Sequence, residues 1–194
     1  MTKLTALPLS ELLAAFRSSE PTPGGGSASA LSSAVGASLL SMVASLQKPR
    51  AATGEEIERL ADAARRCTAL AIQLEALIDQ DTAAYDLVVG AFRLPKGTAE
   101  EKMARGAAIQ KALVAATEAP LTVMRKTSEA LGFAQTVSKL GNQNAASDVQ
   151  VALALLKAGL HGARQNVEIN LGSLKDAAYI DRVRTEISRL SESV

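Results

Sequence analysis

The sequence predicts an all-α protein, a bundle of about six helices, because three of its features agree. Aromatic residues make up 3% of the 194 residues and hydrophobic residues 47%, so the core is built from Ala, Leu, Val and Ile. Alanine is the strongest helix former of these. Apolar residues recur at steps of three and four, and no alternating strand pattern appears. A single domain over residues 1–194 is expected, since this length suits one hydrophobic core.

The first two expected helices are separated by a glycine-rich turn. A short helix capped by Ser10 is expected up to Phe16, and the turn covers residues 20–26. The next helix, over about 27–47, carries no charge and ends before Pro49. Its many serines and its lack of an aromatic belt favour a buried helix over a membrane span. We expect it to be buried in the bundle or against a second subunit.

The longest regular pattern predicts a third helix with one buried seam. Thr53 and Glu56 form a capping box at its start, and Leu94-Pro95-Lys96-Gly97 ends it. Cys67 lies on the seam and is expected to be a small core residue. The seam has heptad spacing and comprises Ile57, Leu60, Ala64, Cys67, Ala71, Leu74, Ile78, Asp81, Tyr85, Val88 and Phe92.

A fourth helix is expected to open with a second capping box. This box pairs Thr98 with Glu101. The helix is expected to run towards Leu131, with a kink at Pro120 and Gly132 as its stop.

Two further helices complete the expected fold. A turn over residues 141–144 leads to a helix that Ser147 or Asp148 caps and that continues to about Leu171. The last helix is amphipathic, with an apolar face of Ile180, Val183, Ile187 and Leu190.

Composition excludes several classes of function. The 21 basic and 20 acidic residues leave a net charge of +1, so neither nucleic acid nor a membrane is indicated as a partner. One cysteine cannot form an internal disulfide, and it favours a cytoplasmic location. With His161 as the single histidine, no metal site is expected, and no cofactor. His161 also lacks the serine elbow of a hydrolase, and the glycines at 24–26 lack the dinucleotide fingerprint.

Asp81 is the sharpest anomaly in the pattern, because it is a carboxylate on an otherwise apolar or aromatic seam. Burying a carboxylate costs on the order of several kcal/mol unless the carboxylate is paired or faces a cavity. It is either a structural ion pair or a cap for a neighbouring helix, or it is an acid, a base or a cation-stabilising group in a pocket between helices.

Three further groups of polar residues are chemically suggestive. Residues 22–27 expose backbone N–H groups that suit an anion, or they form a plain flexible turn with Ser27 as the N-cap. Lys96 pairs with a carboxylate or is simply exposed. The last group supplies donors and acceptors at one loop–helix junction, as any turn and cap would, and consists of Asn142, Asn144, Ser147 and Asp148.

Five motifs together resemble a known family. In chain order they are Pro21-Thr22-Pro23-Gly24-Gly25-Gly26-Ser27, Asp81-x-x-Ala84-Tyr85, Leu94-Pro95-Lys96, Gly141-Asn142-x-Asn144-x-x-Ser147-Asp148 and Asn166-Val167-x-Ile169-Asn170-Leu171. From about Leu9 to Ile187 the chain resembles the cyclodeaminase/cyclohydrolase family, the C-terminal half of formiminotransferase-cyclodeaminase and its stand-alone bacterial relatives. The resemblance implies an all-α homodimer with active sites near the subunit interface and a tetrahydrofolate-bound one-carbon substrate.

The resemblance implies one of two reactions on that substrate. A cyclohydrolase opens the bridge of 5,10-methenyl-tetrahydrofolate with water to give 10-formyl-tetrahydrofolate, and this reaction is expected here. The alternative is a cyclodeaminase, which expels ammonia from 5-formimino-tetrahydrofolate. No formiminotransferase domain is seen, so the chain is not expected to make that formimino substrate itself. A third hypothesis is a non-catalytic helical folate-binding or scaffold protein.

The same resemblance suggests roles for the candidate residues. Asp81 would hold the cationic methenyl bridge and orient or deprotonate the attacking water, and Tyr85 would donate a hydrogen bond or line the pterin pocket. Lys96 and residues 24–27 would bind the carboxylates of the folate tail, and Asn142, Asn144 and Asp148 would read the pterin edge. The expected catalytic residues are Asp81 and Tyr85. The expected substrate-binding residues are Pro23, Gly24, Gly25, Gly26, Ser27, Lys96, Asn142, Asn144, Ser147 and Asp148.

Overall fold

A computed structural model describes residues 3–47 and 52–192, and every regular element within them is helical. This confirms the all-α prediction, and the described chain has six α-helices with no strand. The elements are η1 (Leu4–Ala6), α1 (Leu9–Phe16), α2 (Gly25–Ser45), α3 (Gly54–Phe92), α4 (Ala99–Leu140), η2 (Gln143–Ala145), α5 (Ala146–Leu171) and α6 (Ala177–Glu192).

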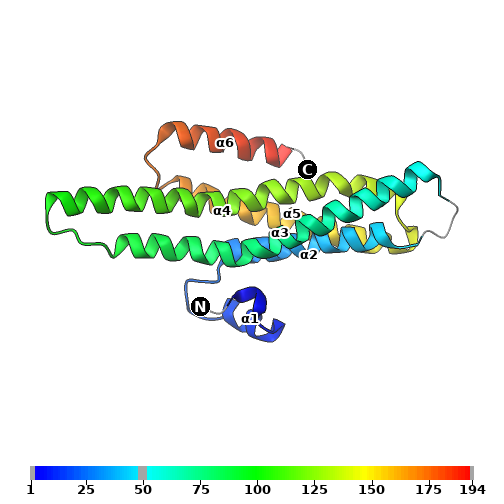
Figure 1. Ribbon diagram of the computed structural model, residues 1–194, viewed down its shortest axis with the longest axis horizontal. Helices are drawn as coiled ribbons and strands as arrows, with labels where there is room; N and C mark the ends of the chain where they lie inside the picture. Colours follow the sequence, from blue (N-terminus) through cyan, green and yellow to red (C-terminus); the bar gives the residue numbers. More distant parts are fainter. Residues whose placement is uncertain (1–2, 48–51, 193–194) are drawn as a thin grey trace.

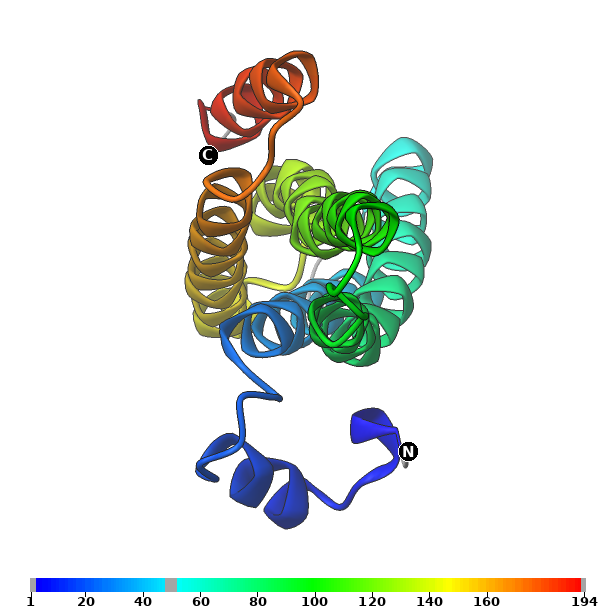
Figure 2. The same cartoon turned by 90° about the vertical axis from the view of Figure 1, so that its left-hand side faces the viewer.

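Four of these helices form the bundle and two lie outside it. Helix α2 packs against α3 and α5, and α4 packs against the same two helices, so the four close into a ring. Figure 2 shows this ring end-on, with α6 on one side and α1 on the other. Helix α6 rests mainly on α4, and η1 rests on α3. The six expected helices therefore divide into a four-helix core and two flanking helices.

Helices α3 and α4 extend well past the start of α2. They form the two longest helices, of 39 and 42 residues, and Figure 1 shows them continuing to the left beyond α2. The predicted seam of α3 is buried at Leu60, Cys67 and Leu74. It is exposed at Tyr85 and Phe92, where burial was wrongly expected, because α2 no longer lies beside α3 there. Burial was also wrongly expected at Ile57, which is exposed in the first turn of α3.

Small residues allow α2 and α5 to approach closely. A Cβ atom on Gly36 would lie 2.7 Å from Cγ of Leu156, and one on Gly159 would collide with the Ser33 hydroxyl. Both distances are shorter than real Cβ contacts allow. Both glycines are therefore required by packing rather than by backbone freedom.

The uncharged helix α2 is buried on one side only. Its inner face lies in the core, whereas Val35 and Met42 are 43% and 41% exposed. The expectation of burial within the bundle is therefore confirmed for one face. By length and composition alone, α2 is also the one helix in the described chain that is both long and apolar enough to cross a membrane. The core helix of a bundle passes the same test, and α2 has the buried side that such a helix needs.

Several helix boundaries follow the predicted signals. Both capping boxes form, with Glu56 bonding back to Thr53 and Glu101 to Thr98. Gly132 was wrongly expected to stop α4, which continues to Leu140. A lone glycine costs a helix only about 1 kcal/mol, and packing on the neighbouring helices outweighs it.

The serine and aspartate caps were wrongly placed. Ser10 lies inside α1, which starts after Pro8, and Ser27 lies in the first turn of α2, which starts after Gly24. Neither Ser147 nor Asp148 caps α5, because η2 leads directly into it at Ala146. Packing of the preceding chain fixes these starts, and the sequence signal for a cap does not include it. The expected break at Pro49 falls outside the described residues.

Cys67 and His161 occupy the places that their surroundings in the sequence suggest. Cys67 is fully buried, and burial together with the charge of Glu129 raises the pKa of its thiol to about 12. It is thus a core residue and not a nucleophile. His161 lies exposed on α5.

Candidate functional site

The carboxylate of Asp81, on α3, lies against the first turn of α2. Its Oδ2 accepts a hydrogen bond from the Ser27 hydroxyl at 3.0 Å, and the Ser27 backbone N–H also donates to this carboxylate. The Ser27 side chain is completely buried, and its hydroxyl lies 2.9 Å from the Ile78 carbonyl oxygen. Asp81 therefore caps α2 from the side, where the helix dipole favours a negative charge.

Two glycines of this turn lie against polar side chains of the neighbouring helices, and Gly26 makes room for one of them. A Cβ on Gly26 would collide with Oδ1 of Asp81, so only glycine allows the carboxylate to approach. A Cβ on Gly25 would lie 3.4 Å from Nδ2 of Asn166 on α5. Gly26 thus serves the close approach of Asp81, whereas a side chain on Gly25 would make an ordinary contact with Asn166. The two glycines do not form a flexible turn, since both lie within α2.

Burial favours the protonated form of the Asp81 carboxyl. It raises the pKa of the carboxyl above its ordinary value, and the hydrogen bonds from the Ser27 hydroxyl and backbone offset part of that rise. Within the described residues, 3–47 and 52–192, no salt bridge to Asp81 forms. Of the two structural hypotheses, the contact of Asp81 with the first turn of α2 is present through Ser27, and no ion pair to Asp81 forms among the described residues. A half-buried carboxylate with a raised pKa and no cation beside it is suited to proton transfer.

Other polar groups of α3 lie near this carboxylate. Thr82 Oγ1 is 3.4 Å from the Ser27 hydroxyl, and Tyr85 follows one turn later with 40% of its surface exposed. Pro23 and Gly24 lie half-buried on the segment that leads into α2. Thr82 therefore adds a second hydroxyl group beside the contact between Ser27 and Asp81.

The asparagine cluster expected in the same site lies at the other end of the bundle. Nδ2 of Asn142 donates to the carbonyl of Gln47, just beyond the end of α2, and Oδ1 of Asn142 accepts from the backbone of Asn144. Since α2 has 21 residues, this end is about 30 Å from Asp81. Ser147 and Asp148 lie in the first turn of α5 beside it. One chain therefore does not bring this cluster to Asp81.

Lys96 lies in a third place, exposed in the loop that joins α3 and α4. The eleven helical steps from Asp81 to Phe92 span about 17 Å, so the lysine does not reach the carboxylate within one chain. The predicted site residues thus gather at three positions along the bundle.

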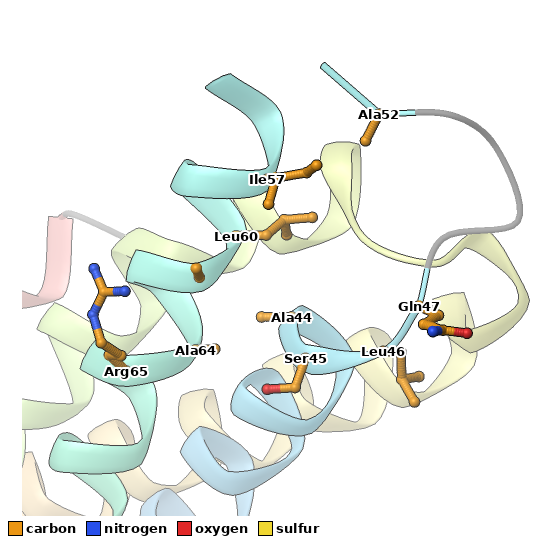
Figure 3. Close-up of a pocket in the computed structure, with 10 residues that line it drawn as sticks. Ala44, Ser45, Leu46, Gln47, Ala52, Ile57, Leu60, Ala64 and Arg65 are labelled. Carbon is orange, nitrogen blue, oxygen red and sulfur yellow. The ribbon is translucent and has the colours of Figure 1, made fainter. Parts of the chain in front are cut away.

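A pocket of about 650 Å³ opens at the same end as Asn142. Its lining is mainly apolar, and Figure 3 shows Ile57 and Leu60 of α3 across from Ala44, near the end of α2. Gln47 lines this pocket and also accepts the hydrogen bond from Asn142, so pocket and asparagine cluster adjoin. Within the described chain, no three His, Cys, Asp or Glu side chains gather to hold a metal ion.

Asn166 is the residue near Asp81 to which sequence reasoning assigned no role. It belongs to the fifth motif, in which Asn166 and Asn170 lie one helical turn apart. Asn170 donates to the carbonyl of Ala116 on α4, whereas Asn166 lies beside Gly25. The signal that could have identified Asn166 was the presence of both its motif and the glycine turn in one sequence. In the fold the two motifs meet, because α2 and α5 are neighbours in the ring.

Comparison with known proteins gives concordant matches. A family model described as formiminotransferase-cyclodeaminase matches residues 8–189. A methenyltetrahydrofolate cyclohydrolase of Methylorubrum extorquens is 41% identical over 173 residues, which cover 89% of this chain and 83% of that protein. A formimidoyltransferase-cyclodeaminase of Rattus norvegicus is 36% identical over 87% of this chain, which spans only 31% of that longer protein.

The fold also has a counterpart among solved structures. The crystal structure of formiminotetrahydrofolate cyclodeaminase from Thermotoga maritima superposes with a TM-score of 0.87. It covers 98% of this chain and 91% of the other, at 23% identity. At this identity the likeness shows a shared fold.

Proposed function

The chain belongs to the formiminotransferase-cyclodeaminase family, and we propose that it is a methenyltetrahydrofolate cyclohydrolase. It would open the bridge of 5,10-methenyl-tetrahydrofolate with water and give 10-formyl-tetrahydrofolate. The 41% identical relative from Methylorubrum extorquens, matched over most of both chains, supports this reaction over others of the family.

The observation that carries the proposal is the Asp81 carboxylate at the start of α2, half-buried and with no cation beside it among the described residues. The methenyl bridge is a delocalised cation, so a carboxylate in a partly desolvated place stabilises it and attracts it. Because its pKa is raised, Asp81 is also a stronger base than an exposed aspartate. The Ser27 hydrogen bonds hold its orientation during both roles.

The reaction balances with Asp81 as the proton carrier. Water attacks the bridging carbon between N5 and N10, a carbon–oxygen bond forms, and Asp81 accepts one proton from that water. The bond from carbon to N5 then breaks, the hydroxyl loses its proton to form the formyl carbonyl, and N5 gains a proton. One proton in total passes to solvent, matching the positive charge that the bridge loses.

The other candidate residues are assigned to binding. Tyr85 lines the approach to Asp81, and residues 23–27 with Lys96 bind the anionic parts of the folate. The rest of the folate is contacted by Asn142, Asn144, Ser147 and Asp148. No cofactor is required, residues 1–194 form a single domain, and the location is the cytoplasm.

A homodimer would reunite the separated groups. Within one chain, the asparagine cluster lies about 30 Å from Asp81, at the opposite end of α2. Two copies packed antiparallel along this face would place the cluster and pocket of one copy against the Asp81 of the other. The uncharged outer face of α2, with Val35 and Met42 exposed, is suited to such a contact.

The test is a pair of assays on the purified protein. Loss of the ultraviolet absorbance of 5,10-methenyl-tetrahydrofolate reports the cyclohydrolase reaction. Ammonia release from 5-formimino-tetrahydrofolate reports the alternative, a cyclodeaminase, which the match to the Rattus norvegicus protein supports. Ammonia release alone would overturn the proposal in favour of that alternative. Activity in neither assay would favour a folate-binding scaffold.

A further inference from the structure

Asn166 reaches the same turn of α2 as Asp81, but from the opposite side. Asp81 comes from α3 and Asn166 from α5, and these two helices flank α2 in the ring. Asp81 takes the space that a side chain on Gly26 would fill, and Asn166 lies 3.4 Å from the corresponding Cβ position of Gly25. The two polar groups therefore border one short stretch of backbone.

Only half of the Asn166 amide is occupied. Its Nδ2 donates to the carbonyl of Gly162, one turn earlier on α5, at 2.9 Å. A carbonyl can only accept, so this contact fixes which end of the amide is nitrogen. The side chain makes no other hydrogen bond to the described residues. Its Oδ1, at the other end of the amide whose Nδ2 lies beside Gly25, is therefore left as an acceptor without a partner among them. The side chain is half-buried, so a ligand at this turn reaches it without opening the bundle.

We propose that Asn166 is a substrate-positioning residue whose Oδ1 accepts a hydrogen bond from an N–H group of the pterin ring. The proposal rests on the proposed function, in which Asp81 faces the methenyl bridge. The pterin adjoins that bridge and carries N–H donors, so a neutral acceptor across the turn from Asp81 suits it. A neutral amide at this point also adds no second negative charge beside the carboxylate, which would raise the pKa of Asp81 further.

Asn170 supplies a matched control on the same helix. It lies one turn from Asn166 and is half-buried like it, but it donates to the Ala116 carbonyl and ties α5 to α4. A role in packing alone predicts that Asn166→Ala and Asn170→Ala change stability and leave substrate affinity alone. A positioning role predicts that only Asn166→Ala changes affinity.

The experiment measures kcat, KM and melting temperature for the wild-type protein, Asn166→Ala and Asn170→Ala, with 5,10-methenyl-tetrahydrofolate as substrate. Calorimetric titration with tetrahydrofolate measures binding separately. We expect Asn166→Ala to raise KM and the tetrahydrofolate Kd about tenfold, as for one lost hydrogen bond, with a smaller change in kcat. Asn170→Ala should leave KM and Kd within about twofold of the wild type.

The two proposals fail in different ways. A wild-type protein that binds tetrahydrofolate but turns over neither substrate contradicts the proposed function, and the Kd of Asn166→Ala still decides the role of this residue. Unchanged KM and Kd in Asn166→Ala, with normal wild-type turnover, overturn the positioning role alone. A wild-type protein that does not bind tetrahydrofolate overturns both.

Discussion

Replacing Asp81 with asparagine separates the catalytic and structural roles of this carboxylate. The change keeps the shape of the side chain and an oxygen that accepts from Ser27, but it removes the negative charge. The methenyl cation then loses its counter-charge and the attacking water loses its base. The contact with the first turn of α2 persists in a weaker, neutral form.

The magnitudes of the two effects differ widely. Loss of a general base lowers turnover by on the order of a hundredfold or more. For stability, burial disfavours the charged form of Asp81, so its removal offsets part of the weakened hydrogen bonding, and we expect a change within about 1 kcal/mol. A buried ion pair would instead cost roughly 3–5 kcal/mol when broken, but no such pair to Asp81 is formed in the described chain.

The assay follows turnover of 5,10-methenyl-tetrahydrofolate and thermal unfolding on the same preparations. Asp79→Asn is the matched control, because Asp79 lies on α3 just before Asp81 but accepts hydrogen bonds from Leu4 and Thr5 of the N-terminal segment. It should retain turnover while loosening that segment. An Asp81→Asn protein that unfolds far earlier yet turns over normally while folded would refute the catalytic role.

Three further outcomes are expected. Gly26→Ala should lower both melting temperature and turnover, by about 1–3 kcal/mol in stability, because its Cβ collides with the Asp81 carboxylate, whereas Gly90→Ala, with open space around it, should be neutral or stabilising. The folded state raises the pKa of Asp81, so it binds this proton more tightly than the unfolded chain. The wild type should therefore lose stability relative to Asp81→Asn as pH rises from the ordinary aspartate value through the raised pKa, which melting curves across pH will check. Arg125→Met should loosen α6 by about 1 kcal/mol, since its partly exposed pairs with Glu118 and Glu186 are screened, and hydrogen exchange of α6 amides reports it.

The fold was predictable where the signal is local. The capping box of Thr53 and the apolar spacing from Leu60 to Leu74 depend on residues one or two turns apart, and both were confirmed. The burial of Tyr85 was wrongly predicted because periodicity reports a stripe on one helix and not the length of its neighbour. Gly132 misled for a similar reason, since packing outweighs a single weak helix former.

The candidate site was predictable only in part. Asp81 was identifiable because a carboxylate on an apolar seam conflicts with its surroundings, and the structure shows what resolves the conflict, a bare helix turn made by Gly26. The separation of Asn142 from Asp81 was not predictable from motif order. It follows from the length of α2, whose two ends carry the two groups, and from the direction in which α5 returns.

The serines of α2 affect how strongly the surface of this helix is hydrated. Ser38 and Ser45, both exposed, donate to the carbonyl four residues earlier, so their hydroxyls are already occupied within the helix. Such a hydroxyl holds surface water less firmly than its residue type implies, because its proton is not offered outward. A surface of this kind sheds its hydration layer at little enthalpic cost, although a hydropathy scale counts every serine in it as polar.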